Sequence, residues 1–404
     1  MGGGCVSWLK TTLGPHVDLT SGPAFESRYF TDDPSDIPLV KGENIGQGMI
    51  HWDKSKYWPR TESDGYDKFV LKPGDIVLAM DRPWISAGLK FAVISERDPE
   101  ALLVQRVACM RGVNGLSSKY LRYIIASPQF SAYAKNIMGG TNVPHISGNQ
   151  IRAFPFSLPP KGEQQRITSI LSPYDDLIEN NRRRIALLEE AARLLYREWF
   201  VHLRFPGHEH VAIKDGVPEG WEKKALSELA EFINGFAFKP MHLGEVGLPI
   251  VKIPELKQGV SEKTPRNPGD LIPEKYHLCD GDILFSWSGT LAVNVWANGP
   301  AILNQHLFNV VPNGIVSRAF LMFTLREALN RFDNQTVGAT MKHIRRSALD
   351  KVFVLLPDHT LLITIDEILN NTYEQLIALH KQNQKLAQAR DLLLPRLMNG
   401  EIAV

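Results

Sequence analysis

The sequence contains two copies of one pattern, and this internal repeat constrains the fold more than any other feature of the chain. Trp8 and Gly22 recur as Trp221 and Gly235, both 213 positions later (221 − 8). Further pairs follow in the same order along both halves: Pro38 with Pro249, Gly74 with Gly281, Ala101 with Ala301, His145 with His343 and Pro159 with Pro357. Their displacement falls gradually to 198 (357 − 159), as expected if the second copy has lost a few loop residues. The repeat predicts two similar globular units of about 160 residues, each followed by one long helix.

Residues 161–202 and 364–399 carry the heptad pattern of long helices that pack along a partner helix. The seam of mostly apolar residues advances alternately by four and three positions. In the first segment it comprises Ile167, Leu171, Tyr174, Ile178, Asn181, Ile185, Leu188, Ala192, Leu195 and Trp199. In the second it comprises Ile365, Leu369, Thr372, Leu376, Leu379, Asn383, Leu386, Arg390, Leu393 and Leu397. Each seam contains one Asn, a polar insertion of the kind that fixes the register of a coiled coil.

Two arrangements of these helices are open from the pattern. Each helix could cover only its own neighbouring domain, which is the commoner fate of an amphipathic helix. Ten consecutive seam positions in each segment favour the other arrangement, in which the two helices pair with each other. A helix of this length spans about 60 Å, so we interpret the pair as a spacer.

Within each globular unit, short strands bounded by Gly, Pro and Asp mix with a few helices. Gly-Asp before an apolar β-branched run predicts a turn and then a strand in residues 69–80 and 277–287. Residues 117–127 and 317–329 have the composition of helices. Because strands and helices do not alternate strictly, the pattern predicts an α+β fold rather than a doubly wound sheet.

Composition excludes several classes of protein. The net charge of +1 and a pI near 7.8 are too low for a dedicated basic nucleic-acid domain, so any DNA surface must be a local concentration of Lys and Arg. The three cysteines, Cys5, Cys109 and Cys279, lack the spacing of a zinc site or a disulfide framework. We find no signal peptide and no apolar run that could span a membrane, and we expect a cytoplasmic protein.

Motifs for catalysis are also missing from the sequence. It has no P-loop and no complete GxGxxG, and no Asn/Asp-Pro-Pro-aromatic string that an amino-methyltransferase would place against its target base. Glu222-Lys223-Lys224 matches the end of a nuclease-type pattern, but three such residues on a polar face are usually solvated charge. His145 and His343 have no neighbouring ligand or acid-base partner in the sequence. We therefore predict a protein without catalytic residues, metal site or cofactor of its own.

The repeated order of these features resembles the specificity subunits of type I restriction-modification systems. Residues 158–167, LPPKGEQQRI, are similar to the start of that family's long helix, and residues 389–402, ARDLLLPRLMNGEI, to its C-terminal end. The resemblance covers essentially the whole chain. It implies a non-catalytic subunit that binds double-stranded DNA and two modification subunits, which supply S-adenosylmethionine-dependent adenine methylation. It also implies restriction subunits, a motor and nuclease that use ATP and magnesium.

The resemblance implies that the two globular units are target-recognition domains for the two halves of a bipartite, asymmetric DNA site. We predict an α+β protein in which two such domains are separated by two long antiparallel coiled-coil helices with pseudo-twofold symmetry. The expected segments are a first target-recognition domain at 1–160, a central helix at 161–205, a second domain at 206–358 and a C-terminal helix at 359–404. The length of the helices would set the distance between the half-sites.

Candidate DNA contacts are side chains that can distinguish base edges or neutralise phosphates. In the first domain they are Lys41, Asn44, Arg82, Gln105, Arg106, Thr141, Asn142 and His145. In the second they are Lys252, Ser286, Ser288, Thr290, Asn304, Gln305, His306, Lys342, His343 and Arg345. For Gln105 and Gln305 a buried structural amide is an equal alternative, since both recur in apolar surroundings. For His145 and His343 the alternative is packing at a hinge.

Two other functions remain open from the sequence. One is a coiled-coil scaffold that organises partner proteins without base recognition. The other is a nuclease with an unrecognised active site, against which the absence of paired carboxylates counts.

Overall fold

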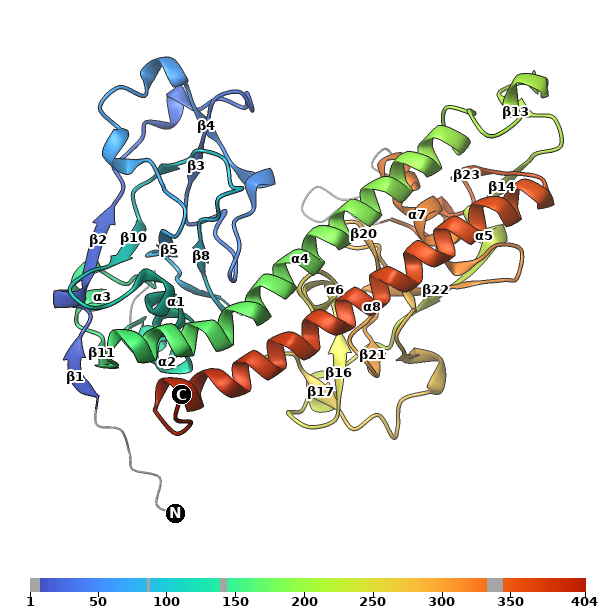
Figure 1. Cartoon of the computed structure of the whole chain (residues 1–404). Helices are drawn as coiled ribbons and strands as arrows, with labels where there is room; N and C mark the ends of the chain where they lie inside the picture. The colour runs from blue at the N-terminus through green and yellow to red at the C-terminus, as the bar shows by residue number, and fades with distance from the viewer. Residues whose placement is uncertain (1–7, 86–87, 139–143, 333–343) are drawn as a thin grey trace. The chain divides into compact units, whose positions relative to one another are not determined.

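The computed structural model describes residues 8–85, 88–138, 144–332 and 344–404 (Figure 1). The chain divides into two compact units, of which the first contains the residues up to 175 together with 388–404 and the second contains residues 176–387. Both boundaries fall inside a long helix, so each helix contributes one part to each unit. The expected limits at residues 160, 205 and 358 separate domains from helices, whereas the observed packing groups each domain with the helix segments beneath it.

The first unit is built on an antiparallel four-stranded sheet in the order β2-β10-β5-β8. A three-stranded sheet β4-β3-β9, a pair β1-β11 and a small hairpin β6-β7 adjoin it. The strands are β1 (Leu9–Thr12), β2 (Val17–Ser21), β3 (Ile37–Val40), β4 (Tyr57–Trp58), β5 (Ile76–Ala79), β6 (Trp84–Ile85), β7 (Gly88–Leu89), β8 (Phe91–Val93), β9 (Leu102–Leu103), β10 (Val107–Gly112) and β11 (Pro155–Leu158). The helices are α1 (Ser118–Ala126), α2 (Pro128–Met138) and α3 (Gly148–Arg152).

The second unit has the same plan. Its antiparallel sheet has the order β15-β22-β19-β20, and a second sheet has the order β17-β16-β21-β18. The strands are β12 (Ile213–Lys214), β13 (Val217–Pro218), β14 (Glu222–Ala225), β15 (Ala230–Asn234), β16 (Leu248–Val251), β17 (Arg266–Asn267), β18 (His277–Leu278), β19 (Ile283–Ser286), β20 (Ala292–Val295), β21 (Ala301–Leu303), β22 (Leu307–Pro312) and β23 (Phe353–Leu356). The helices are α5 (Leu226–Leu229), α6 (Ile253–Gln258) and α7 (Arg318–Phe332).

Strand registers confirm the internal repeat. Leu9 pairs with Leu158 in β1-β11, and Glu222 pairs with Leu356 in β14-β23, so partners shift by the displacements of 213 and 198 found in the sequence. In both units a parallel pair, β3-β9 or β16-β21, lies beside an otherwise antiparallel framework. Mixed strands and helices in two repeated units confirm the predicted α+β fold.

The repeated glycines Gly22 and Gly235 have a specific structural reason. A Cβ atom at Gly22 would lie 2.2 Å from the carbonyl oxygen of Leu103, and one at Gly235 would lie 2.3 Å from that of Asn304. Only a residue without a side chain permits this approach of two backbone segments. The glycines are therefore required where the chain leaving β2 or β15 crosses the loop that follows β9 or β21.

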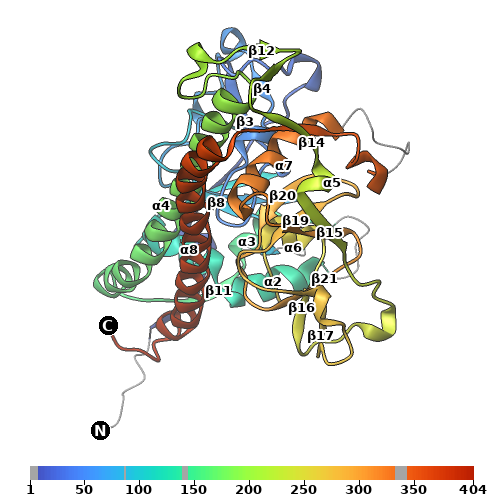
Figure 2. The same cartoon turned by 90° about the vertical axis from the view of Figure 1, so that its right-hand side faces the viewer.

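The two long helices are α4 (Lys161–Phe200) and α8 (His359–Met398). In the second unit, their segments 176–200 and 359–387 lie side by side and run in opposite directions in both views (Figures 1 and 2). The seam amide of Asn181 donates hydrogen bonds of 3.0 Å to the side-chain oxygens of Gln382 and Asn383. The predicted mutual pairing is thus present within this unit.

Most seam positions are buried or half-buried, as the heptads predicted. Thr372 is half-buried, and its hydroxyl donates to the carbonyl one turn earlier, at Ile368. The next residue, Tyr373, lies outside the predicted seam but is more deeply buried, and its hydroxyl donates to the carbonyl of Gly281 at 2.7 Å.

Each globular core continues into the helix segments of its own unit. In the second unit, Tyr196 of α4 packs on Phe320 of α7 with ring centroids 5.8 Å apart, and α7 lies against strands β20 and β22. In the first unit, Ile167 and Leu171 of α4 and Leu394 of α8 join the core formed by α1 and the large sheet. This continuous burial fixes each domain on the helix segments beneath it.

Candidate nucleic-acid interface

Equivalent loops connect β9 to β10 and β21 to β22, and their middle residues are polar. The backbone N–H of Gln105 donates to the carbonyl of Pro23 at 2.8 Å, and that of Gln305 donates to Phe236 at 3.0 Å. These anchors hold both loops in the same place in their units. Gln105 and Arg106 are exposed, Gln305 is half-buried and His306 is exposed. The alternative of a core amide therefore does not hold for Gln105.

Two further predicted residues, Arg82 and His145, lie near the loop of the first unit. The N–H of Arg82 donates to the carbonyl of Pro144 at 2.7 Å, which places His145 next to Asp81. His145 Nδ1 lies 2.7 Å from Asp81 Oδ1, and Arg106 Nη1 lies 3.4 Å from the same oxygen. The structure therefore brings Arg106 and His145 together at Asp81, which Arg82 follows in the chain. Asp81 was not among the candidates, and its position beside Arg82 in the sequence was the available signal.

In the second unit, an aromatic side chain lies beside the equivalent loop. The ring of Trp287 lies 6.3 Å from that of His306, and its indole N–H donates to Asn234 at 3.2 Å. The N–H of Ile344 donates to the carbonyl of Trp287 at 3.0 Å, so the exposed Arg345 follows close to this site. Thr290 is exposed on the turn between β19 and β20.

Four of the predicted DNA contacts have buried side chains, so these predictions are corrected: Asn44, Ser286, Ser288 and Asn304. The side chain of Asn44 is 1% exposed and bonds to the backbone of Leu39 and Lys41 and to the hydroxyl of Ser55. Such a side chain holds a loop together and presents no edge to a ligand. These residues therefore leave the set of candidate contacts.

Two of the predicted lysines, Lys41 and Lys252, are half-buried. Lys41 Nζ pairs with Glu43 at 2.6 Å and lies 5.3 Å from the centre of the Phe30 ring. Lys252 precedes α6, where its N–H donates to the carboxylate of Glu255 at 3.0 Å. The candidates Thr141, Asn142, Lys342 and His343 lie outside the described residues.

Comparison with known protein families shows to which family the chain belongs. The model of the type I restriction modification DNA specificity domain matches twice, at residues 9–190 and 218–388, which together cover most of the chain. The chain belongs to the type I restriction-modification DNA specificity family. The two matches coincide with the two structural repeats, and the predicted resemblance is confirmed.

The chain is also similar to individual members of the specificity family. The chain is 26% identical over 310 residues to the type I restriction enzyme MjaIX specificity subunit of Methanocaldococcus jannaschii, covering 72% of this chain and 70% of the relative. It is 23% identical to the HindI specificity subunit of Haemophilus influenzae over 98% of this chain and 99% of the relative. A crystal structure of the type I S subunit from M. genitalium has the same fold, with a TM-score of 0.52 and 16% identity over 98% of this chain and 97% of that chain.

Neither of the two cysteines in the described residues, Cys109 and Cys279, is an activated nucleophile. Burial raises the pKa of the Cys109 thiol to about 12, and burial together with Asp282 raises that of Cys279. A thiol with a raised pKa stays protonated near neutral pH and is unreactive. In the same part of the chain, no group of three His, Cys, Asp or Glu side chains could hold a metal ion.

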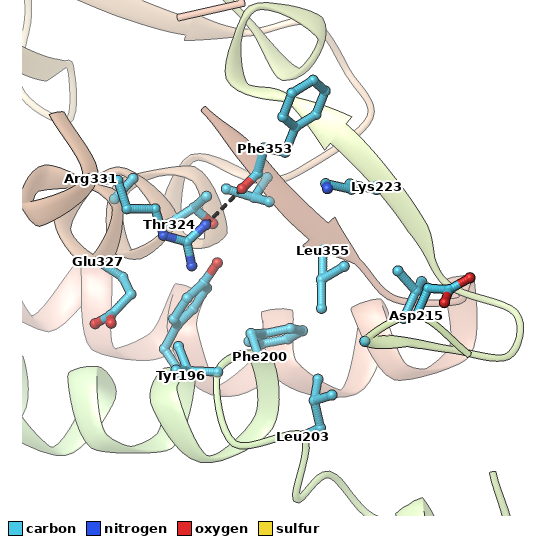
Figure 3. A pocket seen from close by; sticks show the side chains of 15 residues that line it. Tyr196, Phe200, Leu203, Asp215, Lys223, Thr324, Glu327, Arg331, Phe353 and Leu355 are labelled. Atoms are coloured by element: carbon cyan, nitrogen blue, oxygen red, sulfur yellow. Dashed lines mark hydrogen bonds between the residues drawn. The ribbon is translucent and has the colours of Figure 1, made fainter. Parts of the chain in front are cut away.

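A cavity of about 250 Å³ lies in the second unit between α4, α7 and the pair β14-β23 (Figure 3). Arg331 donates to the carbonyl of Phe353 at 2.7 Å, and Lys223 lies over the Phe353 ring. Burial raises the pKa of Tyr196, which keeps its hydroxyl neutral. The described residues that line it include Asp215, Lys223 and Glu327 but no His or Cys.

Proposed function

We propose that this chain is the DNA sequence-specificity subunit of a type I restriction-modification complex and has no catalytic function of its own. The observation that carries this proposal is the coincidence of two specificity-domain matches with two units that present equivalent polar loops. Each unit recognises one half of a bipartite DNA site. The alternative, a scaffold without base recognition, gives no reason for these loops to differ in their polar side chains.

The side chains on the two loops suit direct recognition of bases. An exposed Gln amide such as that of Gln105 can contact N6 and N7 of adenine, and an Arg such as Arg106 can contact O6 and N7 of guanine. At the equivalent positions the second unit has Gln305 and His306. Because the second member of the pair differs, we expect the two half-sites to differ in sequence. Arg82 and Arg345 are exposed and supply cations for phosphates.

The two long helices keep the half-sites a defined distance apart. Each has 40 residues, which corresponds to a length of about 60 Å. An antiparallel pairing along their whole length would relate the two units by a pseudo-twofold axis, so that each could face the DNA from an opposite direction.

The outer faces of these helices suit the docking of modification subunits. In the second unit, Leu187 and Leu194 of α4 are 70% and 50% exposed, one heptad apart, and Ile363 and Ile368 of α8 are also exposed. Exposed apolar residues at this spacing are typical of a helix surface that a partner covers. Because the domain occurs twice, we expect two modification subunits, one for each unit. Those partners supply S-adenosylmethionine chemistry, and restriction subunits supply ATP- and magnesium-dependent cleavage.

None of the helices in the described part of the chain has the length and apolar character of a membrane span. Because the complex acts on genomic DNA, we expect it in the cytoplasm.

The decisive experiment is single-molecule mapping of methylated adenines in cells that express this chain with its modification subunits. We expect methylation at one split motif with two different halves and a constant gap. Methylation scattered over unrelated adenines would contradict the proposal, and cleavage of DNA by the purified chain with a metal ion would support a nuclease instead.

Paired variants separate recognition from assembly. Gln105→Ala together with Arg106→Ala should weaken or relax recognition of one half of the motif while the complex still assembles. Gln305→Ala together with His306→Ala should affect only the other half. A scaffold without base recognition predicts that both variants leave the methylated motif unchanged.

A further inference from the structure

Asp81 is an acidic residue at the centre of the basic cluster in the first unit. Its Oδ1 atom contacts both His145 at 2.7 Å and Arg106 at 3.4 Å. Arg82 follows it in the chain, and the half-buried ammonium of Lys90 interacts electrostatically with Glu43, Arg82 and Asp81. The carboxylate of Asp81 therefore stands among four basic side chains, one of which, Lys90, also lies near the carboxylate of Glu43.

The backbone around this carboxylate is held in an unusual conformation. Arg82 has φ of 45° and Arg106 has φ of 64°, both in the left-handed region that residues with side chains rarely adopt. The carbonyl of Arg106 accepts a hydrogen bond of 2.8 Å from Met80, which ties the two strained segments together. Such strain persists only where the surrounding fold maintains it, and it is found most often at functional sites.

The ion pair itself contributes little to the stability of the fold. The side chains of Arg106 and Asp81 are 60% and 40% exposed, and solvent screens pairs with such exposure. The effect of the carboxylate on a charged ligand is therefore more important than its effect on the folded chain.

In the second unit, a neutral residue stands at the position equivalent to Asp81. Ile146 donates to the carbonyl of Met80, and Ile344 donates in the same way to the carbonyl of Trp287, so Asp81 and Ser288 occupy equivalent positions. Ser288 is neutral and 4% exposed. At this position, therefore, only the first unit carries an acidic residue.

We propose that Asp81 determines specificity by weakening sequence-independent binding of DNA to the first unit. Its negative charge repels a phosphate that approaches the basic cluster and partly neutralises Arg106, which lowers the phosphate contribution that dominates non-specific affinity. Arg106 has five N–H donors, so its contact with Asp81 leaves donors that can reach a base edge. The carboxylate thus disfavours binding of DNA that lacks the target sequence, and disfavouring competing ligands is a general means of increasing specificity. This inference rests on the proposed function.

The test compares Asp81→Asn and Asp81→Ser with the unchanged chain, each assembled with its modification subunits. Asp81→Ser introduces the residue of the second unit. Binding is measured over a range of salt concentrations, on a duplex with the mapped motif and on a duplex of the same composition without it. Asp64→Asn is the matched control, because it removes one charge from an exposed position of the same unit.

Both Asp81 variants should bind the duplex without the motif about three- to tenfold more tightly, with a salt slope steeper by up to about 0.9 for each additional phosphate that the protein neutralises. Affinity for the duplex with the motif should change less than affinity for the other, so the ratio between the two falls. The control should change neither. Unchanged or weaker non-specific binding by both variants would overturn the inference, as would loss of discrimination at a single base pair, since Asp81 would then recognise a base. If the unchanged complex binds both duplexes equally, the proposed function itself fails.

Discussion

At the scale of single residues, side chains of similar chemistry have different environments in this protein. Asn44 and Gln105 are both amides in loops of the first unit, but Asn44 is enclosed by Leu39 and Ser55, whereas Gln105 is exposed. Burial with internal partners assigns the first to the fold, and exposure leaves the second available to DNA.

Asn44→Ala should therefore lower stability, and Gln105→Ala should not. Loss of the Asn44 amide leaves the carbonyl of Leu39 without this donor, at a cost of about 1–3 kcal/mol. Urea denaturation followed by circular dichroism measures this difference. A stable Asn44→Ala variant with weakened DNA binding would show that the assignment is inverted.

The repeated glycines give a second prediction for single residues. Gly22→Ala and Gly235→Ala should each destabilise their unit by about 3 kcal/mol, because the new methyl group would overlap a backbone carbonyl. Gly42→Ala is the matched control, since its Cβ would lie 3.7 Å from its neighbour, Ala79. Thermal unfolding should show a marked decrease for the first two variants and almost none for the control.

At the scale of elements, the paired helix segments of the second unit contain a polar contact in an apolar seam. Asn181 is 2% exposed and bonds to Asn383 and Gln382 across the pair. A buried amide at a seam position costs stability and fixes register, because any shift would leave its groups without partners.

Asn181→Ala should destabilise the chain by about 1–3 kcal/mol, since it leaves the side-chain oxygen of Asn383 without this donor. The double variant Asn181→Leu with Asn383→Leu should recover that loss, because both polar groups are replaced by apolar ones. Asn180→Ala, at the neighbouring exposed position, is the control for helix propensity. A double variant less stable than Asn181→Ala, as judged by the urea midpoint, would mean that the amides contribute net stability.

At the scale of the whole molecule, the proposed function implies that the length of the helix pair sets the distance between the two DNA half-sites. Deleting one heptad from each helix shortens it by about 10 Å, which is close to three base pairs, and rotates the following residues by only about 20°. Mapping of methylated adenines should therefore show a shorter gap between unchanged half-sites. Altered half-sites, or an unchanged gap with full activity, would contradict this role.

The sequence by itself determined the repeat, the two long helices, the α+β class and the family, because these depend on periodicity and on the order of many residues. The tertiary structure alone decided which candidate side chains are accessible. Loops have no periodicity from which burial can be predicted, so the interior position of Asn44 and Asn304 depends on distant partners. The left-handed backbone at Arg82 and Arg106 could not be predicted either, since that conformation is expected of glycine. Asp81 became a candidate only when folding placed it against Arg106 and His145, residues 25 and 64 positions away.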